Sequence, residues 1–186
     1  MKLFVSAPFF LAGGIIAGIS SAFLATQTFG TTAAIKDSPW EMRDNSPGSA
    51  VHPYTTAHYL LDGRLPPSAG QFLELTAEHD AGGKPINASC DYLLTLPAGK
   101  TPRWWSIAAF AGRLTADGST LMNQSAVAET DGSFRIAVTR HPQPGNWIKA
   151  PASGRFTLLY MSSKSQAGTS GRPATPALFT IATSGC

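Results

Sequence analysis

The fold is decided by the stretch Asp131–Tyr160, which reads DGSFRIAVTRHPQPGNWIKAPASGRFTLLY. Two strand-like runs, FRIAVTR and RFTLLY, enclose a segment with Pro and Gly residues that carries Trp147. The Asp-Gly pair before the first run is a signal for a tight hairpin turn. We therefore expect two strands of one β-domain, linked by a crossing segment, with most of the remaining chain packed against this unit or tethering it.

The turn-forming residues of this stretch predict its local shape. Asp-Gly supplies the positive φ that a tight turn needs. Pro-Gly-Asn can turn the chain so that the Trp147 ring packs on the sheet as a plug, burying about 150–250 Å². Asn146 is expected to hydrogen-bond nearby backbone, and a later proline ends the crossing. The residues with a predicted structural role are Asp131, Gly132, Pro144, Gly145, Asn146, Trp147 and Pro151.

Further strand-like runs recur along the chain at roughly ten-residue spacing, separated by Gly and Pro turns. This pattern favours an all-β domain, an antiparallel β-sandwich of jelly-roll-like form, over a parallel α/β sheet. Helix-like spacing in residues 54–63 predicts a short helix before the first strand. The predicted strands cover residues 71–80, 90–96, 104–112, 134–140, 155–161 and 177–183, with one or two short edge strands within 122–128.

The N-terminal run Phe4–Thr26 contains no charged residue. As a helix it is about 34 Å long, enough to cross a hydrocarbon core of about 30 Å. A cleaved signal peptide is the alternative, but the run is longer than a typical signal core and its cleavage pattern is poor. We therefore expect an uncleaved transmembrane helix. Gly14, Gly18 and Ala22 share one of its faces and are candidates for helix packing, although small residues are common in membrane helices.

The expected organisation has three parts: an anchor at 1–26, a linker at 27–52 and a β-sandwich domain at 53–186. Lys2 is the only charged side chain before the anchor, so the N-terminus is expected to stay in the cytoplasm. The C-terminal domain would then be periplasmic, in a single-pass protein of a bacterial inner membrane. The lipid bilayer is the expected partner, with another envelope protein or a second copy of the chain as further candidates.

Charge argues against a nucleic-acid partner. Only 13% of the 186 residues are charged, the net charge is +3, and the cations are scattered singly along the chain. Nucleic-acid binding requires a clustered basic face. No cofactor is expected either, because the chain has no motif for one.

Seven parts of the chain follow one another in a known pattern: Tyr92–Gly99, Arg103–Ile107, Asn123, Asp131–Phe134, Pro144–Ile148, Ala150–Pro151 and Gly154–Leu158. Together they resemble the bacterial family catalogued as domain of unknown function 1214, over about residues 63–163. The similarity is to its short envelope form, with one N-terminal span and a cysteine near the end. The resemblance implies a β-sandwich and carries over no catalytic residue. One departure is Phe110-Ala111-Gly112, where the family has a Tyr-Asp-like strand end.

The two cysteines, Cys90 and Cys186, are expected to form a disulfide, because paired cysteines in an oxidising compartment often bridge. Independent thiols, or pairing of Cys186 between chains, are the alternatives. A metal site built from His58, His79, Asp80 and Asp91 lacks any spacing motif, so these residues are interpreted as surface polar groups and no metal is expected. No G-x-S-x-G sequence is present to anchor a catalytic triad.

Arg103, Trp104 and Trp105 form the one candidate ligand platform, for a sugar or a lipid headgroup. Adjacent residues of a strand face opposite ways, so one tryptophan can be core and the other exposed; burial of both is the favoured interpretation.

The sequence leaves two functions open. The favoured one is an envelope binding or interaction module without catalysis. The alternative is an envelope enzyme that acts on glycan or lipid through Asp91 or Glu129 near the tryptophan pair.

Overall fold

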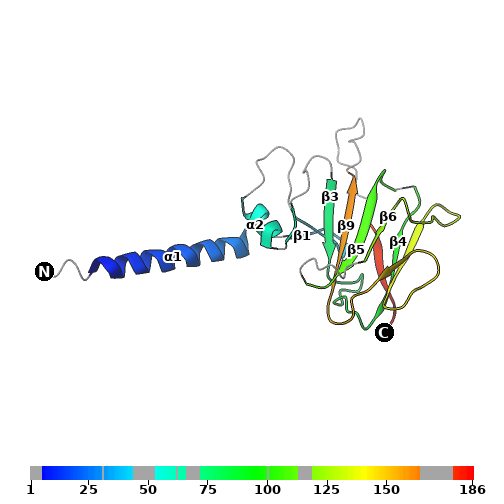
Figure 1. The fold of residues 1–186 in the computed structure, drawn as a ribbon. Helices are drawn as coiled ribbons and strands as arrows, with labels where there is room; N and C mark the ends of the chain where they lie inside the picture. Colours follow the sequence, from blue (N-terminus) through cyan, green and yellow to red (C-terminus); the bar gives the residue numbers. More distant parts are fainter. Residues whose placement is uncertain are drawn as a thin grey trace, which may run out of the picture.

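A computed structural model of the chain describes residues 6–30, 32–43, 53–61, 63–65, 72–99, 101–112, 119–163 and 178–186. They form two β-sheets that pack face to face, with one long helix projecting away from them and one short helix at the junction (Figure 1). The predicted β-sandwich, the N-terminal apolar helix and the short helix before residue 72 are therefore confirmed.

The helices are α1 (Ser6–Thr28) and α2 (Pro53–Leu61). The strands are β1 (Thr32–Ala34), β2 (Glu41–Arg43), β3 (Phe72–Ala77), β4 (Asp91–Leu96), β5 (Trp105–Phe110), β6 (Ser119–Met122), β7 (Phe134–Thr139), β8 (Trp147–Lys149), β9 (Thr157–Ser163) and β10 (Thr180–Gly185).

One sheet has the strand order β1-β2-β3-β9-β5-β6, and the other has β10-β4-β7-β8. Neighbouring strands are antiparallel, with β7 and β8 as the one parallel pair among the described strands. The short link 140–146 therefore carries the chain back along β7 before β8 begins. The sequence predicts a crossing here and not a strand because of the Pro and Gly residues. The observed link is shorter than the roughly dozen residues that a parallel connection usually needs.

The apolar alternation of the strands produces the core. In β4 the buried residues are Tyr92, Leu94 and Leu96, and their neighbours point outward. In β5 nearly every position is buried, because the strand lies between β9 and β6 and one of its faces packs on the second sheet. Full burial of an apolar side chain of this size contributes about 1.5–3 kcal/mol. The sandwich interior is thus the main source of stability.

The expected linker contributes to the larger sheet. β1 and β2 form a hairpin within residues 32–43, and β2 pairs with β3. Trp40, next to β2, is fully buried, and its Nε1 donates a hydrogen bond of 2.6 Å to the carbonyl of Phe179. Each of these strands has three residues, too few for a detectable period of two. The segment that follows α1 is therefore part of the larger sheet.

The short edge strand β6 lies at Ser119–Met122, not within 122–128 as the sequence predicts. The polar start of β6 follows an Asp-Gly pair and so has the composition of a turn. The actual turn, at Asn123–Ser125, begins where the strand was expected. The position of β6 is fixed by its pairing with β5, because Ser106 lies opposite Met122 in the antiparallel register.

Cys90 and Cys186 are joined by a disulfide in the structure, with their Cα atoms 4.1 Å apart. Cys90 precedes β4, and Cys186 follows β10, the strand that pairs with β4. The bridge therefore closes one end of this strand pair and encloses a sequence separation of 96 residues.

Candidate functional site

Trp105, one member of the predicted aromatic platform, lies in the core. Its exposed fraction is 0%, and its ring makes edge-on contacts of 5.3 Å with the rings of both Phe134 and Phe179. Its Nε1 has no hydrogen-bond partner among the described residues. The indole therefore joins the two sheets and presents no face to a ligand.

Trp104 lies at the end of the same sheet and is half-buried. Its ring stands edge-on to Phe72 at 5.7 Å, and its backbone N–H donates to the Ser163 hydroxyl at 3.2 Å. Arg103 is exposed beside it, and its carbonyl accepts a bond from Asn123 Nδ2. Trp104 and Arg103 thus share one end of the sandwich, where only part of the indole is accessible.

The Asp131–Gly132 turn has a structural hydrogen-bond pattern. Asp131 Oδ1 accepts from the Ser133 backbone N–H at 2.8 Å, and Gly132 has a φ of 81°. Bonds from Ser133, its hydroxyl first, lower the pKa of the Asp131 carboxyl below its ordinary value. Glu129 closes the same turn through backbone bonds with Gly132 and Ser133. The Asp131 carboxylate and the Glu129 backbone together shape the entry into β7.

Asn146 holds the crossing segment in place. Its Nδ2 donates to the carbonyls of Val127 at 2.7 Å and Arg135 at 3.0 Å, and its Oδ1 accepts from the Val127 N–H. The neighbouring Gly145 has a φ of 82°. Asn146 therefore ties the crossing to the segment that precedes β7.

Trp147 begins β8, and its ring is half-buried. Its Nε1 donates to the Thr139 hydroxyl at 2.9 Å, so the indole is held along the parallel strand pair. Pro151, after β8, is buried. The indole covers the side of the pair and does not plug the sheet centre.

The four polar residues considered for a metal are dispersed. His58 lies on α2, where its Nε2 is 3.1 Å from the Phe29 carbonyl oxygen. Asp91 begins β4, and His79 is exposed next to Asp80. Across the described ranges no group of three or more His, Cys, Asp or Glu side chains has the geometry to hold a metal ion.

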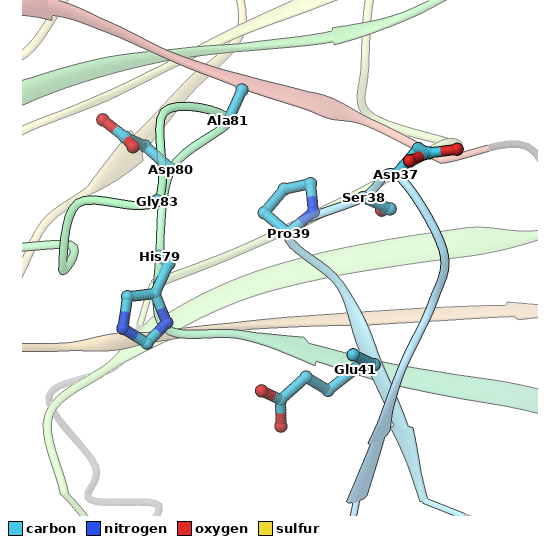
Figure 2. Close-up of a pocket in the computed structure, with 9 residues that line it drawn as sticks. Asp37, Ser38, Pro39, Glu41, His79, Asp80, Ala81 and Gly83 are labelled. Carbon is cyan, nitrogen blue, oxygen red and sulfur yellow. The ribbon is translucent and has the colours of Figure 1, made fainter.

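A pocket of about 520 Å³ lies between the β1–β2 turn and the turn that follows β3. Figure 2 shows the side chains around it, from residues 37–41 on one side and 79–83 on the other. The two turns are distant in the sequence and meet because β2 pairs with β3. No motif in the sequence indicates this pocket, because neither turn has a recognisable binding pattern. Its lining residues are Ala34, Asp37, Ser38, Pro39, Glu41, His79, Asp80, Ala81 and Gly83.

The acidic side chains of this pocket do not converge on one point. Figure 2 shows the Asp37 and Asp80 carboxylates pointing in opposite directions. Asp80 Oδ1 accepts bonds of 2.9 Å from the N–H groups of Gly82 and Lys84, and its Oδ2 accepts from the Thr183 hydroxyl at 2.7 Å. The Thr183 bond is the largest cause that lowers the pKa of Asp80. Glu41 accepts a bond from Thr32 and keeps one carboxylate oxygen for other contacts.

The enzyme hypothesis requires a carboxylate close to the tryptophan pair, and Asp91 does not lie close to it. Leu96 pairs with Phe134, whose ring contacts Trp105, whereas Asp91 is at the opposite end of β4. Five residues of extended strand span about 17 Å. Asp91 is therefore too distant to act together with a ligand held at Trp104 or Trp105.

Comparisons with known proteins agree with the fold. The family described as "Protein of unknown function (DUF1214)" matches residues 71–163. No curated protein matches the chain. A solved structure, the VPA0106 protein from Vibrio parahaemolyticus, is 15% identical with a TM-score of 0.51, over 67% of this chain and 33% of that one.

An uncharacterized protein from Burkholderia cenocepacia is 22% identical with a TM-score of 0.43, over 60% of this chain and 29% of that one. This chain therefore matches about a third of the length of either solved protein. At 15% identity the Vibrio structure shows similarity of fold alone.

Proposed function

For this chain, which belongs to the DUF1214 family of unknown function, we propose the role of a membrane-anchored module of the bacterial cell envelope. It binds a partner and has no chemistry of its own. In this proposal α1 crosses the inner membrane once, with its N-terminus in the cytoplasm and the sandwich in the periplasm. Lys2, on which the orientation depends, lies outside the described residues.

The anchor is supported by the surface of α1. The segment Pro8–Thr28 has a mean hydropathy of 1.8, and none of it is buried inside the structure. A signal sequence near an N-terminus can also meet these limits of length and composition. The proposal of an uncleaved span is favoured by the length of α1, because its 23 residues exceed the apolar core of about 7–15 residues that is typical of a signal peptide.

Binding is favoured over catalysis because two of the carboxylates have structural roles. Asp80 and Asp131 hold turns, and the hydrogen bonds that do so lower both pKa values. General acid catalysis near neutral pH requires a raised carboxyl pKa. The pocket beside the β1–β2 turn supplies the surface for a partner, which is expected to be another envelope protein or a second copy of the chain.

The anchor is tested by alkaline carbonate extraction of membranes and by the intact mass of the purified protein. The full-length protein is expected to remain in the membrane pellet. Release into the supernatant of a chain shortened near Ala25 would show that α1 is a cleaved signal.

Binding is tested by photo-crosslinking in cells. A benzophenone amino acid in place of Ser38, at the pocket, is expected to give one discrete adduct, and the same group in place of exposed Val127 is the control. An adduct of twice the chain mass identifies a second copy. Catalysis is tested separately with the protein in nanodiscs and peptidoglycan fragments or phospholipids as substrates. Turnover that disappears in Glu129→Gln would overturn the proposal.

A further inference from the structure

Exposed apolar side chains gather at the junction between α1 and the sandwich. Leu60 and Leu61 at the end of α2 are 62% and 54% exposed, and Leu65 is 83% exposed. Phe29, just after α1, is 53% exposed. The four side chains belong to two short segments that contact each other, since α2 packs on the end of α1.

The helix α2 presents its leucines outward for a geometric reason. Thr55 and Tyr59 are one turn apart and form the buried face. At about 100° per residue, Leu60 and Leu61 lie about 100° and 200° from Tyr59 and so lie on the exposed side of the helix. A soluble helix normally buries its leucines and exposes its threonines. The reversed pattern indicates that the outer face of α2 has an apolar neighbour of its own.

The end of α2 is held rigidly in this orientation. The Gly63 N–H bonds the Leu60 carbonyl and the Arg64 N–H bonds the Tyr59 carbonyl, which is a Schellman cap with Gly63 at a φ of 71°. Arg64 also forms an ion pair of 2.7 Å with Glu74 of β3 and lies 5.4 Å from the Tyr59 ring centre. The exposed leucines are thus displayed on a fixed element.

The junction also fixes α2 against the end of α1. Gly30 approaches the start of α2 so closely that a Cβ on it would lie 2.5 Å from the Thr55 nitrogen. His58 Nε2 is 3.1 Å from the Phe29 carbonyl oxygen. Figure 1 shows α2 directly beside the end of α1 that joins the sandwich. A bilayer that surrounds α1 therefore ends at the level of α2.

We propose that α2 is a membrane-surface foot: its outer face, Leu60 and Leu61 with Leu65, inserts into the headgroup boundary of the leaflet from which α1 emerges. This inference rests on the proposed anchor. Lipid is the occupant because α2 packs on the end of α1, a helix whose apolar surface is not buried inside the structure. The sequence of α2, PYTTAHYLL, has no Asp, Glu, Lys or Arg that insertion would have to desolvate. Tyr54 is of the residue type enriched at such boundaries.

The test is photo-crosslinking of the full chain in nanodiscs of phosphatidylethanolamine and phosphatidylglycerol. The amino acid p-benzoylphenylalanine replaces Leu61 in one variant and Leu65 in another. It replaces Val127, 69% exposed beyond β6 at the opposite edge of the sheet, as the matched control. Phe23 within α1 is the positive control. Lipid adducts, detected by mass spectrometry, are expected at positions 61, 65 and 23 and not at position 127.

The two proposals fail in different ways in this experiment. Adducts at position 23 but not at 61 or 65 would overturn the membrane foot and leave the anchor standing. Absence of lipid adducts at position 23 would overturn the anchor itself. Crosslinks from position 61 to a second chain in place of lipid would overturn the foot in favour of self-association. Because Leu61 and Leu65 are exposed, their replacement is not expected to unfold the domain, and retention of the disulfide checks this.

Discussion

Trp40 donates the hydrogen of its Nε1 to the carbonyl of Phe179 at 2.6 Å, across a sequence separation of 139 residues. Both residues are buried, and both contact the ring of Tyr160. The segment that follows α1 and the segment before β10 therefore share one part of the core.

Replacement of Trp40 by Phe should lower the free energy of unfolding by more than replacement of Trp105 by Phe. Both indoles are fully buried, but Nε1 of Trp105 has no partner among the described residues, so only the first change leaves a buried carbonyl unpaired. We expect the difference to be about 1–3 kcal/mol. Urea unfolding of both variants measures it, and equal losses would contradict the role given to this bond.

Removal of the Cys90–Cys186 bridge should destabilise the domain. For a separation of 96 residues, the chain-entropy estimate is about 4–5 kcal/mol. The Cys90→Ser variant is expected to unfold at a lower urea concentration than the wild type. On gels, the wild type is expected to migrate differently with and without reducing agent, and the variant is expected to migrate the same in both. A wild-type dimer band on the non-reducing gel would show that the cysteines pair between chains.

Asp80 should make stability depend on acid pH. Its folded pKa lies below the ordinary value of 3.8, mainly because Thr183 donates to it. The stabilisation is therefore present above pH 3.8 and is lost as the pH falls through the folded pKa. Asp80→Asn should be less stable than wild type at pH 7 by roughly 1–2 kcal/mol, and the gap should close in acid.

Two further variants check the cause. Asp91→Asn, at an exposed carboxylate that begins β4, should show a much smaller change. Thr183→Val should raise the Asp80 pKa toward 3.8 in an NMR titration. An unchanged Asp80 pKa in this variant would contradict the assignment to the Thr183 hydroxyl.

Asn146→Asp should loosen the crossing segment. The Asn146 amide group donates to two carbonyls, of Val127 and Arg135, and a carboxylate oxygen in its place would face both of them without a hydrogen. We expect a loss of about 1–3 kcal/mol and faster amide exchange in β8. Gln124→Asp, at an exposed position in the segment between β6 and β7 that also contains Val127, is the control. If the β8 amides of Asn146→Asp exchanged at the wild-type rate, Asn146 would not be what holds the crossing segment in place.

The sequence predicts the long strands and both helices well because their patterns are local. Alternation in β4 or β7 needs only neighbouring residues to be recognised. The same alternation predicts that Trp104 and Trp105 point to opposite sides. It does not decide which of two apolar rings is buried, since that depends on Phe134 and Phe179.

The elements that the sequence does not predict depend on partners distant in the chain. β1, β2 and β8 have three residues each and exist because a longer strand lies beside them. The pocket needs two turns that only the β2–β3 pairing brings together.

The packing role predicted for the small residues of α1 stays a prediction. Gly14 and Gly18 have no atom within 4 Å of where a Cβ would be, and Ala22 is exposed.

The bond between Trp40 and Phe179 has a consequence for biogenesis. If the chain is exported as it is synthesised, Trp40 enters the periplasm early and waits for Phe179, which the ribosome adds 139 residues later. At about 5–20 residues per second this interval lasts roughly 7–28 seconds. During that time the β1–β2 hairpin would lack the partner that closes the core. In an exported chain the fold would therefore be completed only after the final strand had crossed the membrane.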